Sequence, residues 1–185
     1  MKKTLFALAL LLATTHLSAQ IWFTRSGKIS FYSDAPLEKI EAHNKSATSV
    51  LNTADGRLEF AVLIKGFQFE KALMQEHFNE NYMESDKYPK ATFKGSIVNI
   101  DEVDFGKDGT YPVVAKGQLT IHGVTREVEV PGQITVTNGQ IAAQASFEVA
   151  VADYGIEIPA VVRDNIAKVV RVDVDVTYEP FEKGS

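Results

Sequence analysis

The sequence predicts a mainly β protein, with about eight antiparallel strands joined by short turns and interrupted by one amphipathic helix. Two observations lead to this fold class. In most segments apolar and polar residues alternate strictly, which places one face of each strand in a core and the other in water. One segment, residues 69–83, departs from that period, because its apolar residues recur at helical spacing. A lone helix in such a chain must cover a sheet face or one end of a barrel.

The N-terminal residues 1–19 have the organisation of a secretory signal peptide. Lys2 and Lys3 precede an apolar run that ends at Ala13, and Ala19 is a small residue suited to a cleavage site. The run is far shorter than the ~20 residues that a membrane-spanning helix needs. We therefore expect cleavage after Ala19, a periplasmic or secreted protein, and a single domain over residues 20–185.

Charge and cysteine content narrow the function classes. The net charge is −5, and it becomes −7 once Lys2 and Lys3 are removed. Proteins that bind nucleic acid or anionic membrane surfaces usually carry basic patches, so this balance argues against both classes of partner. The chain has no cysteine, which excludes a disulfide framework. Packing and hydrogen bonds must hold the fold.

In the first half of the chain, apolar and polar residues alternate around Ile29 and Phe31, which predicts a strand that ends before Pro36. Residues 40–52 show no regular period and receive no assignment. Next, an Asp55-Gly56 turn leads into a strand over residues 57–65. Its inward residues would be Leu58, Phe60, Val62 and Ile64.

The helix predicted over residues 69–83 has one apolar stripe and one polar side. We expect Leu73, Met74 and Phe78 to lie on the buried stripe and to cover one side or end of the sheet. The helix must end before Pro89, because the residue that precedes a proline is pushed out of helical geometry.

The second half is read as strands separated by turns. Asn138-Gly139 is the strongest hairpin signal, since both residues tolerate positive φ. A short helix over residues 159–167 would begin at Pro159, a residue that suits the first turn of a helix. The predicted strands cover residues 91–100, 111–121, 126–136, 140–151 and 170–179.

These strands could form a two-sheet sandwich or a closed barrel. The strands at 111–121 and 140–151 are longer than the usual ~5–6 residues, which favours a barrel. Small residues, namely Ala115, Gly117, Ala143 and Ala145, fall on the apolar faces. Such residues leave room for a ligand inside an eight-stranded barrel, although they could also serve only to seat the helix. The pattern alone leaves both explanations open.

Three short motifs resemble a known family. His77-Phe78 followed by Lys87-Tyr88-Pro89-Lys90-Ala91-Thr92-Phe93 is similar to the signature segment of the YceI-like family. The segments Gly117–Thr125 and Asp153-Tyr154-Gly155 resemble two further signatures, in the same order. The resemblance implies an eight-stranded antiparallel, lipocalin-like barrel with a long apolar tunnel. It also implies a bound polyisoprenoid or isoprenoid quinone-like lipid that the protein does not change chemically.

The inward positions of the strands and helix then give a set of candidate ligand-binding residues. The tunnel would be lined by Phe60, Val62, Phe78, Phe93, Ile97, Val113, Leu119, Ala143, Ala145, Phe147, Val172 and Val174. Polar contacts at its mouth would come from His77, His122, Asp153, Tyr154 and Arg163.

Catalytic and metal chemistry find little support. The sequence has no cysteine, no Gly-x-Ser-x-Gly motif and no phosphate-binding loop, so we expect no enzyme activity. Close-spaced histidine pairs are also absent, so we expect no metal site and no cofactor other than a bound lipid. The expected partner is a long-chain apolar lipid, with transient contact to a membrane or membrane protein. Two other classes stay open: a stress-related or structural protein-interaction module with no lipid, and a metal- or haem-associated redox accessory.

Overall fold

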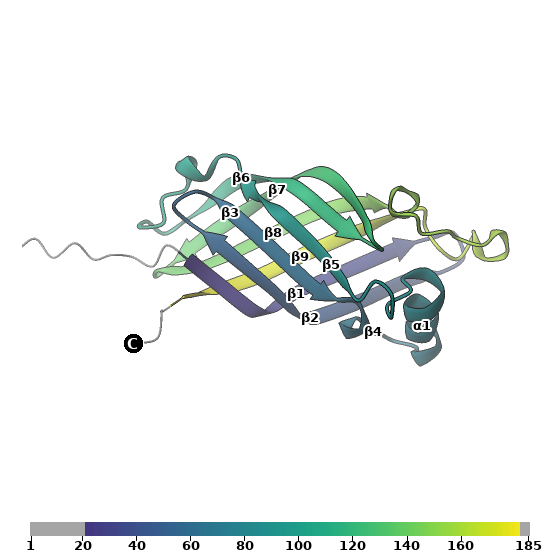
Figure 1. Ribbon diagram of the computed structural model, residues 1–185. Coiled ribbons are helices and arrows are strands. Elements are labelled where there is room, and N and C mark those ends of the chain that lie inside the picture. Colours follow the sequence, from purple (N-terminus) through teal and green to yellow (C-terminus); the bar gives the residue numbers. More distant parts are fainter. Residues whose placement is uncertain (1–20, 182–185) are drawn as a thin grey trace, which may run out of the picture.

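The computed structural model describes residues 21–181, which form a closed antiparallel β-barrel with a helix at one end (Figure 1). The strands are joined in the order β1-β9-β8-β7-β6-β5-β3-β2-β4, and a further β1–β2 pairing closes the sheet. The short β4 pairs only with β2, so eight strands make up the wall. This confirms the predicted fold class. The strands are β1 Ile21–Asp34, β2 Lys39–Asn52, β3 Arg57–Leu63, β4 Gln68–Phe69, β5 Lys90–Ile97, β6 Gly109–Ile121, β7 Val124–Thr137, β8 Gln140–Ala150 and β9 Val169–Pro180.

The helix between β4 and β5 is shorter than predicted. The α-helix α1 covers Ala72–His77 and continues as the π-helical turn η2, Phe78–Tyr82. It begins after residue 69 because Phe69 belongs to β4 and pairs with Ala42. Leu73 is 61% exposed, so its predicted place on the buried stripe is wrong. Met74, Phe78 and Tyr82 face the barrel instead.

The helix predicted over residues 159–167 is reduced to a single 3₁₀ turn, η5, at Ala160–Val162. The backbone of this segment is committed to the β1–β2 hairpin. Leu37 N donates to Asp164 O at 2.9 Å, and Ala167 N donates to Ser33 Oγ at 2.8 Å. Because each backbone group needs one good partner, these bonds compete with continuation of the helix. The other 3₁₀ turns are η1 Ile64–Gly66, η3 Ile100–Glu102 and η4 Val151–Tyr154.

Strand β2 occupies the segment that received no assignment from the sequence. Register shifts on both sides of the Gly27↔Ala47 pair interrupt its pairing with β1. Asn44 is 1% exposed, and its Oδ1 accepts a hydrogen bond from Ser46 N at 2.8 Å. An extra residue in a strand breaks the alternation of apolar and polar positions. This bulge, together with small and polar inward residues, hides the strand from periodicity.

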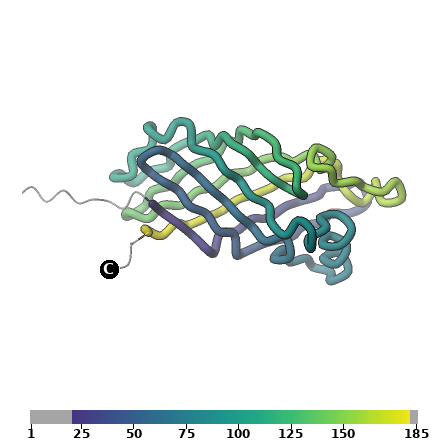
Figure 2. The backbone as a smooth tube through the Cα atoms, viewed as in Figure 1, coloured from purple at the N-terminus to yellow at the C-terminus, as the bar shows by residue number. Residues whose placement is uncertain are grey.

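The two ends of the barrel differ (Figure 2). Residue 21 and residue 181 lie at one end, called here the closed end, and Phe181 N donates to Ile21 O at 2.8 Å. The opposite end, called here the open end, carries α1 and the loop between β8 and β9. The side chains packed inside the closed end are Leu51, Leu58, Ile97, Val103, Ile134, Val136, Ile141, Val176 and Tyr178, each no more than 7% exposed.

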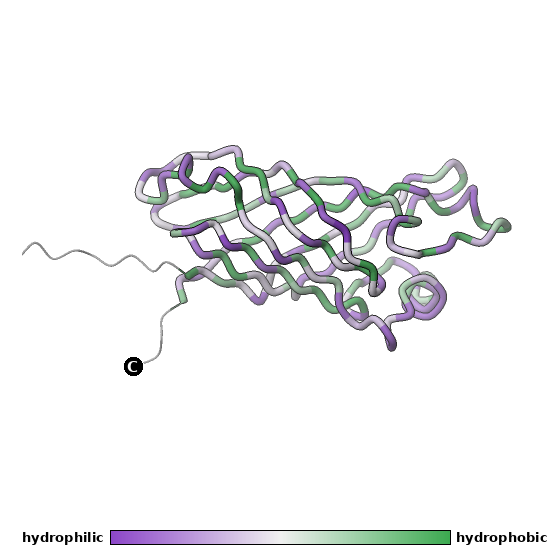
Figure 3. Tube along the Cα trace, turned by 45° about the horizontal axis from the view of Figure 1, so that its top comes forward, coloured by the Kyte–Doolittle hydropathy of each residue, from purple (hydrophilic) through white to green (hydrophobic). Residues whose placement is uncertain are grey.

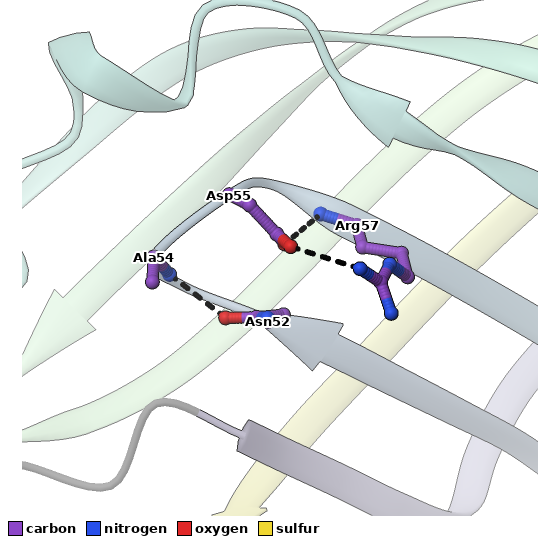
Figure 4. Close-up of polar contacts among 4 residues, drawn as sticks. All are labelled: Asn52, Ala54, Asp55 and Arg57. Carbon is purple, nitrogen blue, oxygen red and sulfur yellow. Dashed lines mark hydrogen bonds and ion pairs between the residues drawn. The ribbon is translucent and has the colours of Figure 1, made fainter.

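The β2–β3 turn illustrates how the closed end is held together (Figure 4). Asn52 Oδ1 accepts from Ala54 N at 3.0 Å, and Asp55 Oδ1 accepts from Arg57 N at 3.0 Å. The Arg57 guanidinium also donates to Asp55 Oδ2 at 3.1 Å. Gly56 adopts a φ of 74°, as the Asp-Gly turn chemistry predicted.

Two glycines opposite each other in β5 and β6 permit a close backbone approach in the wall. A Cβ on Gly95 would overlap with Lys116 O and stand 2.8 Å from the Phe93 ring. A Cβ on Gly117 would stand 2.5 Å from the Cα of Gly95. These glycines let the Phe93 ring lie along the inner wall. Within residues 21–181, no helix is both long and apolar enough to span a bilayer.

Candidate functional site

The interior of the barrel holds an apolar cavity of about 500 Å³. This volume falls within the range of ordinary small-molecule sites, roughly 300–1,000 Å³. The cavity runs from a floor that includes Leu51, Ile134 and Tyr178 to a mouth at the open end near Glu38 and Asn165. Nearly every side chain between floor and mouth is aliphatic or aromatic. Such a wall can bind a long apolar group but offers few hydrogen-bond partners to a polar one.

Strand β9 shows where solid core gives way to cavity. Its inward residues Tyr178 and Val176 are each 1% exposed. Val174 and Val172 point to the same face of the strand but remain half-buried, and both line the cavity. The alternation is unbroken along β9, so the greater exposure of Val174 and Val172 depends on the side chains that lie opposite them. Figure 3 shows apolar and polar residues alternating along the strands of the wall.

All the predicted tunnel residues lie on the wall of this cavity. They are Phe60, Val62, Phe78, Phe93, Ile97, Val113, Leu119, Ala143, Ala145, Phe147, Val172 and Val174. Their contact with a ligand stays a prediction. They come from five strands and the helical segment, and strand alternation identified those on the strands because it fixes which face each residue occupies.

A cluster of phenylalanines fastens the helix over the open end. Phe78 stacks on Phe31 with ring centroids 5.3 Å apart, and it contacts Phe69 at 5.0 Å and Phe67 at 5.8 Å. Aromatic pairs at such distances contribute about 0.5–1.5 kcal/mol each beyond the area they bury. All four rings line the cavity. Sequence reasoning missed Phe31, Phe67 and Phe69 as lining residues, and it placed Phe69 in the helix instead of a strand.

A few polar side chains surround the mouth. Ser33, Glu38, His77 and Asn165 line it, so His77 lies where the sequence predicted. Asn165 Nδ2 donates to Glu38 Oε2 at 3.4 Å, and Lys71 Nζ lies 3.5 Å from Glu38 Oε1. Ser33, Glu38 and Asn165 were missed because nothing in their sequence neighbourhoods distinguishes them from ordinary turn residues.

His122 belongs to a hydrogen-bonded cluster outside the cavity. Its Nε2 lies 2.9 Å from Glu84 Oε2, and its Nδ1 lies 3.2 Å from Tyr154 O. The Tyr88 ring packs edge-on against the imidazole at 4.7 Å. Tyr154 is 4% exposed, and burial raises the pKa of its hydroxyl. The three motifs that carry the family resemblance therefore meet here, where they hold the β6–β7 hairpin, the segment after α1 and η4 together.

The remaining predicted mouth residues also stand apart from the cavity wall. Asp153 is exposed, and its carbonyl oxygen accepts from Arg126 Nε at 3.0 Å. Arg163 is exposed at the end of η5. His122, Asp153, Tyr154 and Arg163 are thus placed around the open end but do not line the cavity.

The described residues contain no group of three or more His, Asp or Glu side chains close enough to hold a metal ion. At the cavity floor, burial raises the pKa of Tyr178, and the hydrogen bond with Ser49 at 2.9 Å partly opposes this rise. Burial also raises the pKa of Tyr82. Both hydroxyls are therefore neutral at physiological pH and present dipoles, not charges, to the cavity.

Comparison with known proteins places this architecture in a family. The model of the YceI-like domain matches residues 16–178. No sequence among curated proteins matches the chain significantly. Among solved structures, a polyisoprenoid binding domain from Saccharophagus degradans, implicated in plant cell wall breakdown, aligns with a TM-score of 0.77 at 15% identity, covering 89% of this chain and 100% of that one.

Two other solved structures share the fold. BcnA from Burkholderia cenocepacia aligns with a TM-score of 0.67 at 17% identity, covering 83% of this chain and 96% of that one. The YceI protein of Campylobacter jejuni aligns with a TM-score of 0.56 at 17% identity, covering 72% and 80%. With the domain match over most of its length and this closed barrel around an apolar cavity, the chain belongs to the YceI-like family.

Proposed function

We propose that this protein is an exported, non-catalytic carrier that holds a long-chain isoprenoid-type lipid in the barrel cavity. The observation that carries the proposal is the 500 Å³ cavity lined almost wholly by apolar side chains. Burial of apolar surface contributes about 25 cal/mol per Å². A lipid chain that is poorly soluble in water therefore gains strongly from such an enclosure. The polyisoprenoid binding domain from Saccharophagus degradans, which has the same fold, supports this ligand class.

The direct test is extraction of the protein after purification from its native compartment. We expect organic solvent to release a long-chain isoprenoid lipid in near-stoichiometric amount, identified by mass spectrometry. The delipidated protein, as the matched control, should rebind geranylgeraniol with a one-to-one end point. A clean extract together with no binding of geranylgeraniol would overturn the proposal. Reproducible co-purification of one protein with the lipid-free form would instead support the protein-interaction module.

Export belongs to the same proposal. The signal-peptide segment, residues 1–19, lies outside the described residues, so the support is its sequence pattern. The expected mature N-terminus is Gln20. Mass spectrometry of the protein from the periplasm or medium measures it directly, and an intact Met1 there would contradict cleavage.

The open end also has a surface suited to transient contact with a bilayer. Leu37, Leu73 and Val161 are 73%, 61% and 88% exposed, and they come from the β1–β2 hairpin, α1 and the β8–β9 loop. The neighbours Glu38 and Val162 line the cavity mouth. The β8–β9 loop projects from this end of the barrel and carries apolar residues at its tip (Figure 3). We propose that this apolar rim touches the membrane during lipid transfer.

Vesicles of phosphatidylethanolamine and phosphatidylglycerol that contain a fluorescent geranylgeraniol derivative test the rim. The double variant Leu37→Ser with Val161→Ser should slow transfer from vesicle to protein at least fivefold, while solution affinity stays unchanged. Val98→Ser is the matched control, because Val98 is 57% exposed but lies after β5 near the closed end. Equal transfer rates for the double variant and wild type would contradict contact through the rim.

A further inference from the structure

The ladder between β7 and β8 covers less than half of the longer strand. The pairing runs from Thr137↔Gln140 to Gly132↔Ala145 and stops there. The other edge of β7 stays paired with β6 as far as Val124, and the other edge of β8 stays paired with β9 as far as Ala150. Residues 124–131 and 146–150 therefore face each other without ladder pairs, a stretch called here the β7–β8 seam. The similar gap beside β2 is filled by β4, whereas no described segment pairs into the seam.

The sequence explains why the ladder stops where it does. Pro131 directly precedes Gly132, the first residue of β7 that pairs with β8, and proline has no N–H to donate. If the register continued, Glu129 would lie opposite Glu148, and like charges opposite each other are destabilising. Each glutamate instead has a basic partner on the neighbouring strand away from the seam. Glu129 lies 3.8 Å from Lys116 of β6, and Glu148 is paired in register with Arg171 of β9.

The seam is a bounded slit and not a frayed end. At the open end of the barrel, Arg126 Nε donates to Asp153 O at 3.0 Å, and His122 Nδ1 lies 3.2 Å from Tyr154 O. These contacts join the β6–β7 hairpin to η4, which follows β8. The two strands are therefore held together at both ends of the seam and separated between them.

The cavity reaches the seam from inside. Val128, Val130, Phe147 and Val149, on the two unpaired edges, all line it. Val130 and Val149 are 9% and 6% exposed, so apolar side chains close the slit. On the outer surface, a hollow of about 450 Å³ lies over the end of the seam, at Pro131 and Ser146, and over the first paired residues beyond it. The residues that line both this hollow and the cavity are Gly132, Gln133, Gln144, Ala145 and Val174.

We propose that the β7–β8 seam is a second, lateral opening of the cavity, through which a long apolar chain enters and leaves. The proposal rests on the cavity being the lipid site. To open the seam, valine and phenylalanine side chains must move, but no ladder hydrogen bond has to break. At the mouth, by contrast, passage is narrowed by the phenylalanine cluster and by the Leu37–Asp164 and Ser33–Ala167 hydrogen bonds. The seam is therefore the part of the described wall that can separate with the fewest interactions broken.

A cross-link across the seam tests this route. The chain has no cysteine, so Glu129→Cys with Glu148→Cys introduces a unique pair of thiols on the outer face. The pair is closed as a disulfide, or by the shortest bifunctional maleimide that joins the thiols, and closure is verified by mass. The matched control is Gln118→Cys with Glu127→Cys, which joins β7 to β6 across a fully paired ladder. The probe is geranylgeraniol carrying a dansyl group, followed by stopped-flow fluorescence.

With the seam closed, we expect both association and dissociation of the probe to slow at least tenfold, while the Kd stays within twofold of wild type. Cleavage of the disulfide should restore both rates, and the control cross-link should change neither. Exchange at the wild-type rate through a verified cross-link would overturn the proposal and assign exchange to the mouth. Failure of the uncross-linked wild type to bind the probe at all would instead count against the proposed function.

Discussion

The two halves of the barrel are made by the same strands, yet one is solid and the other hollow. On β8, Ile141 is 1% exposed, while Ala143 and Ala145, which share its face, are half-buried and line the cavity. On β9 the same change occurs between Val176 and Val174. The strands keep their alternation throughout. Whether the interior fills therefore depends on side-chain size and on what covers the end, and not on strand pattern.

The largest expected effect comes from removing a large side chain in the solid half. Changing Ile141, which is 1% exposed and does not line the cavity, to alanine should lower the free energy of unfolding by about 2–5 kcal/mol, because the surrounding core cannot collapse into the space. Ile121 offers the matched change in the hollow half, where it lines the cavity. Ile121→Ala should cost well under half as much, since its side chain already borders empty space. Urea unfolding of both variants measures the difference, and equal losses would show that the hollow half is packed.

The reverse change, from small to large, should also separate the two regions. Ala145→Trp places a ring in the cavity, so the protein should stay folded while affinity for geranylgeraniol falls at least tenfold. Ala47 is the control, because it is 0% exposed and packs in a cluster with Val62 and Phe67. Ala47→Trp should overpack that cluster and cost about 1–3 kcal/mol. A thermal melt and a binding titration on both variants decide the matter. A large loss of stability in Ala145→Trp would contradict a cavity at this position.

The contrast between the solid and hollow halves also shows which features of the fold the sequence could predict. Alternation identified the face of the predicted lining residues on the strands, such as Phe60 and Val174, because the side-chain period of a strand is fixed by its backbone. It missed β2, where a bulge at Asn44–Ser46 and small polar residues break the period. It could not find Glu38 or Asn165, which reach the mouth through the folding of two distant loops onto each other.

The helix shows the same limit. Met74 and Phe78 were predicted on the buried stripe, and both face the cavity. Leu73 was predicted on the same stripe, but the helix begins later than predicted, because Phe69 is held in β4 by its pairing with Ala42. A tertiary contact therefore set the start of the helix and, with it, the side that faces water. His122 and Tyr154 likewise belong to a hydrogen-bonded cluster that no local sequence pattern predicts.

A smaller effect is expected from the hydrogen bond between Tyr178 and Ser49 at the cavity floor. Tyr178 is 1% exposed, and its hydroxyl lies 2.9 Å from Ser49 Oγ. Tyr178→Phe should cost about 1 kcal/mol at pH 7, the usual net contribution of one hydrogen bond. Ser49→Ala, with the double variant, completes a cycle that isolates the pair. A coupling energy near zero would show that the two hydroxyls do not depend on each other.

The same tyrosine gives a dependence on pH. Burial raises the pKa of Tyr178 in the folded state above its usual value, whereas the tyrosine in the unfolded chain keeps a pKa of about 10. Above about pH 10 the unfolded state therefore loses the proton first, and the free energy of unfolding falls as the pH rises. Below that pH the group contributes no dependence. The difference in stability between wild type and Tyr178→Phe should shrink between about pH 9 and 11, and a constant difference would contradict the burial of the hydroxyl.

The smallest effect is expected at Leu73, on the helix that covers the hollow half. Because Leu73 is 61% exposed, Leu73→Asp removes little buried surface, and an acidic residue in the first helical turn is favourable. Stability should change by no more than about 0.5 kcal/mol.

Met74→Asp is the matched variant one residue later, where the side chain lines the cavity and an unpaired charge is costly. Met74→Asp should become sensitive to protease between β4 and β5, while Leu73→Asp should resist as wild type does. Transfer of labelled geranylgeraniol from vesicles gives Leu73→Asp a second readout, since loss of an apolar group from the rim should slow transfer without loss of fold. Cleavage of Leu73→Asp at the rate of Met74→Asp would mean that the outer side of α1 is covered after all.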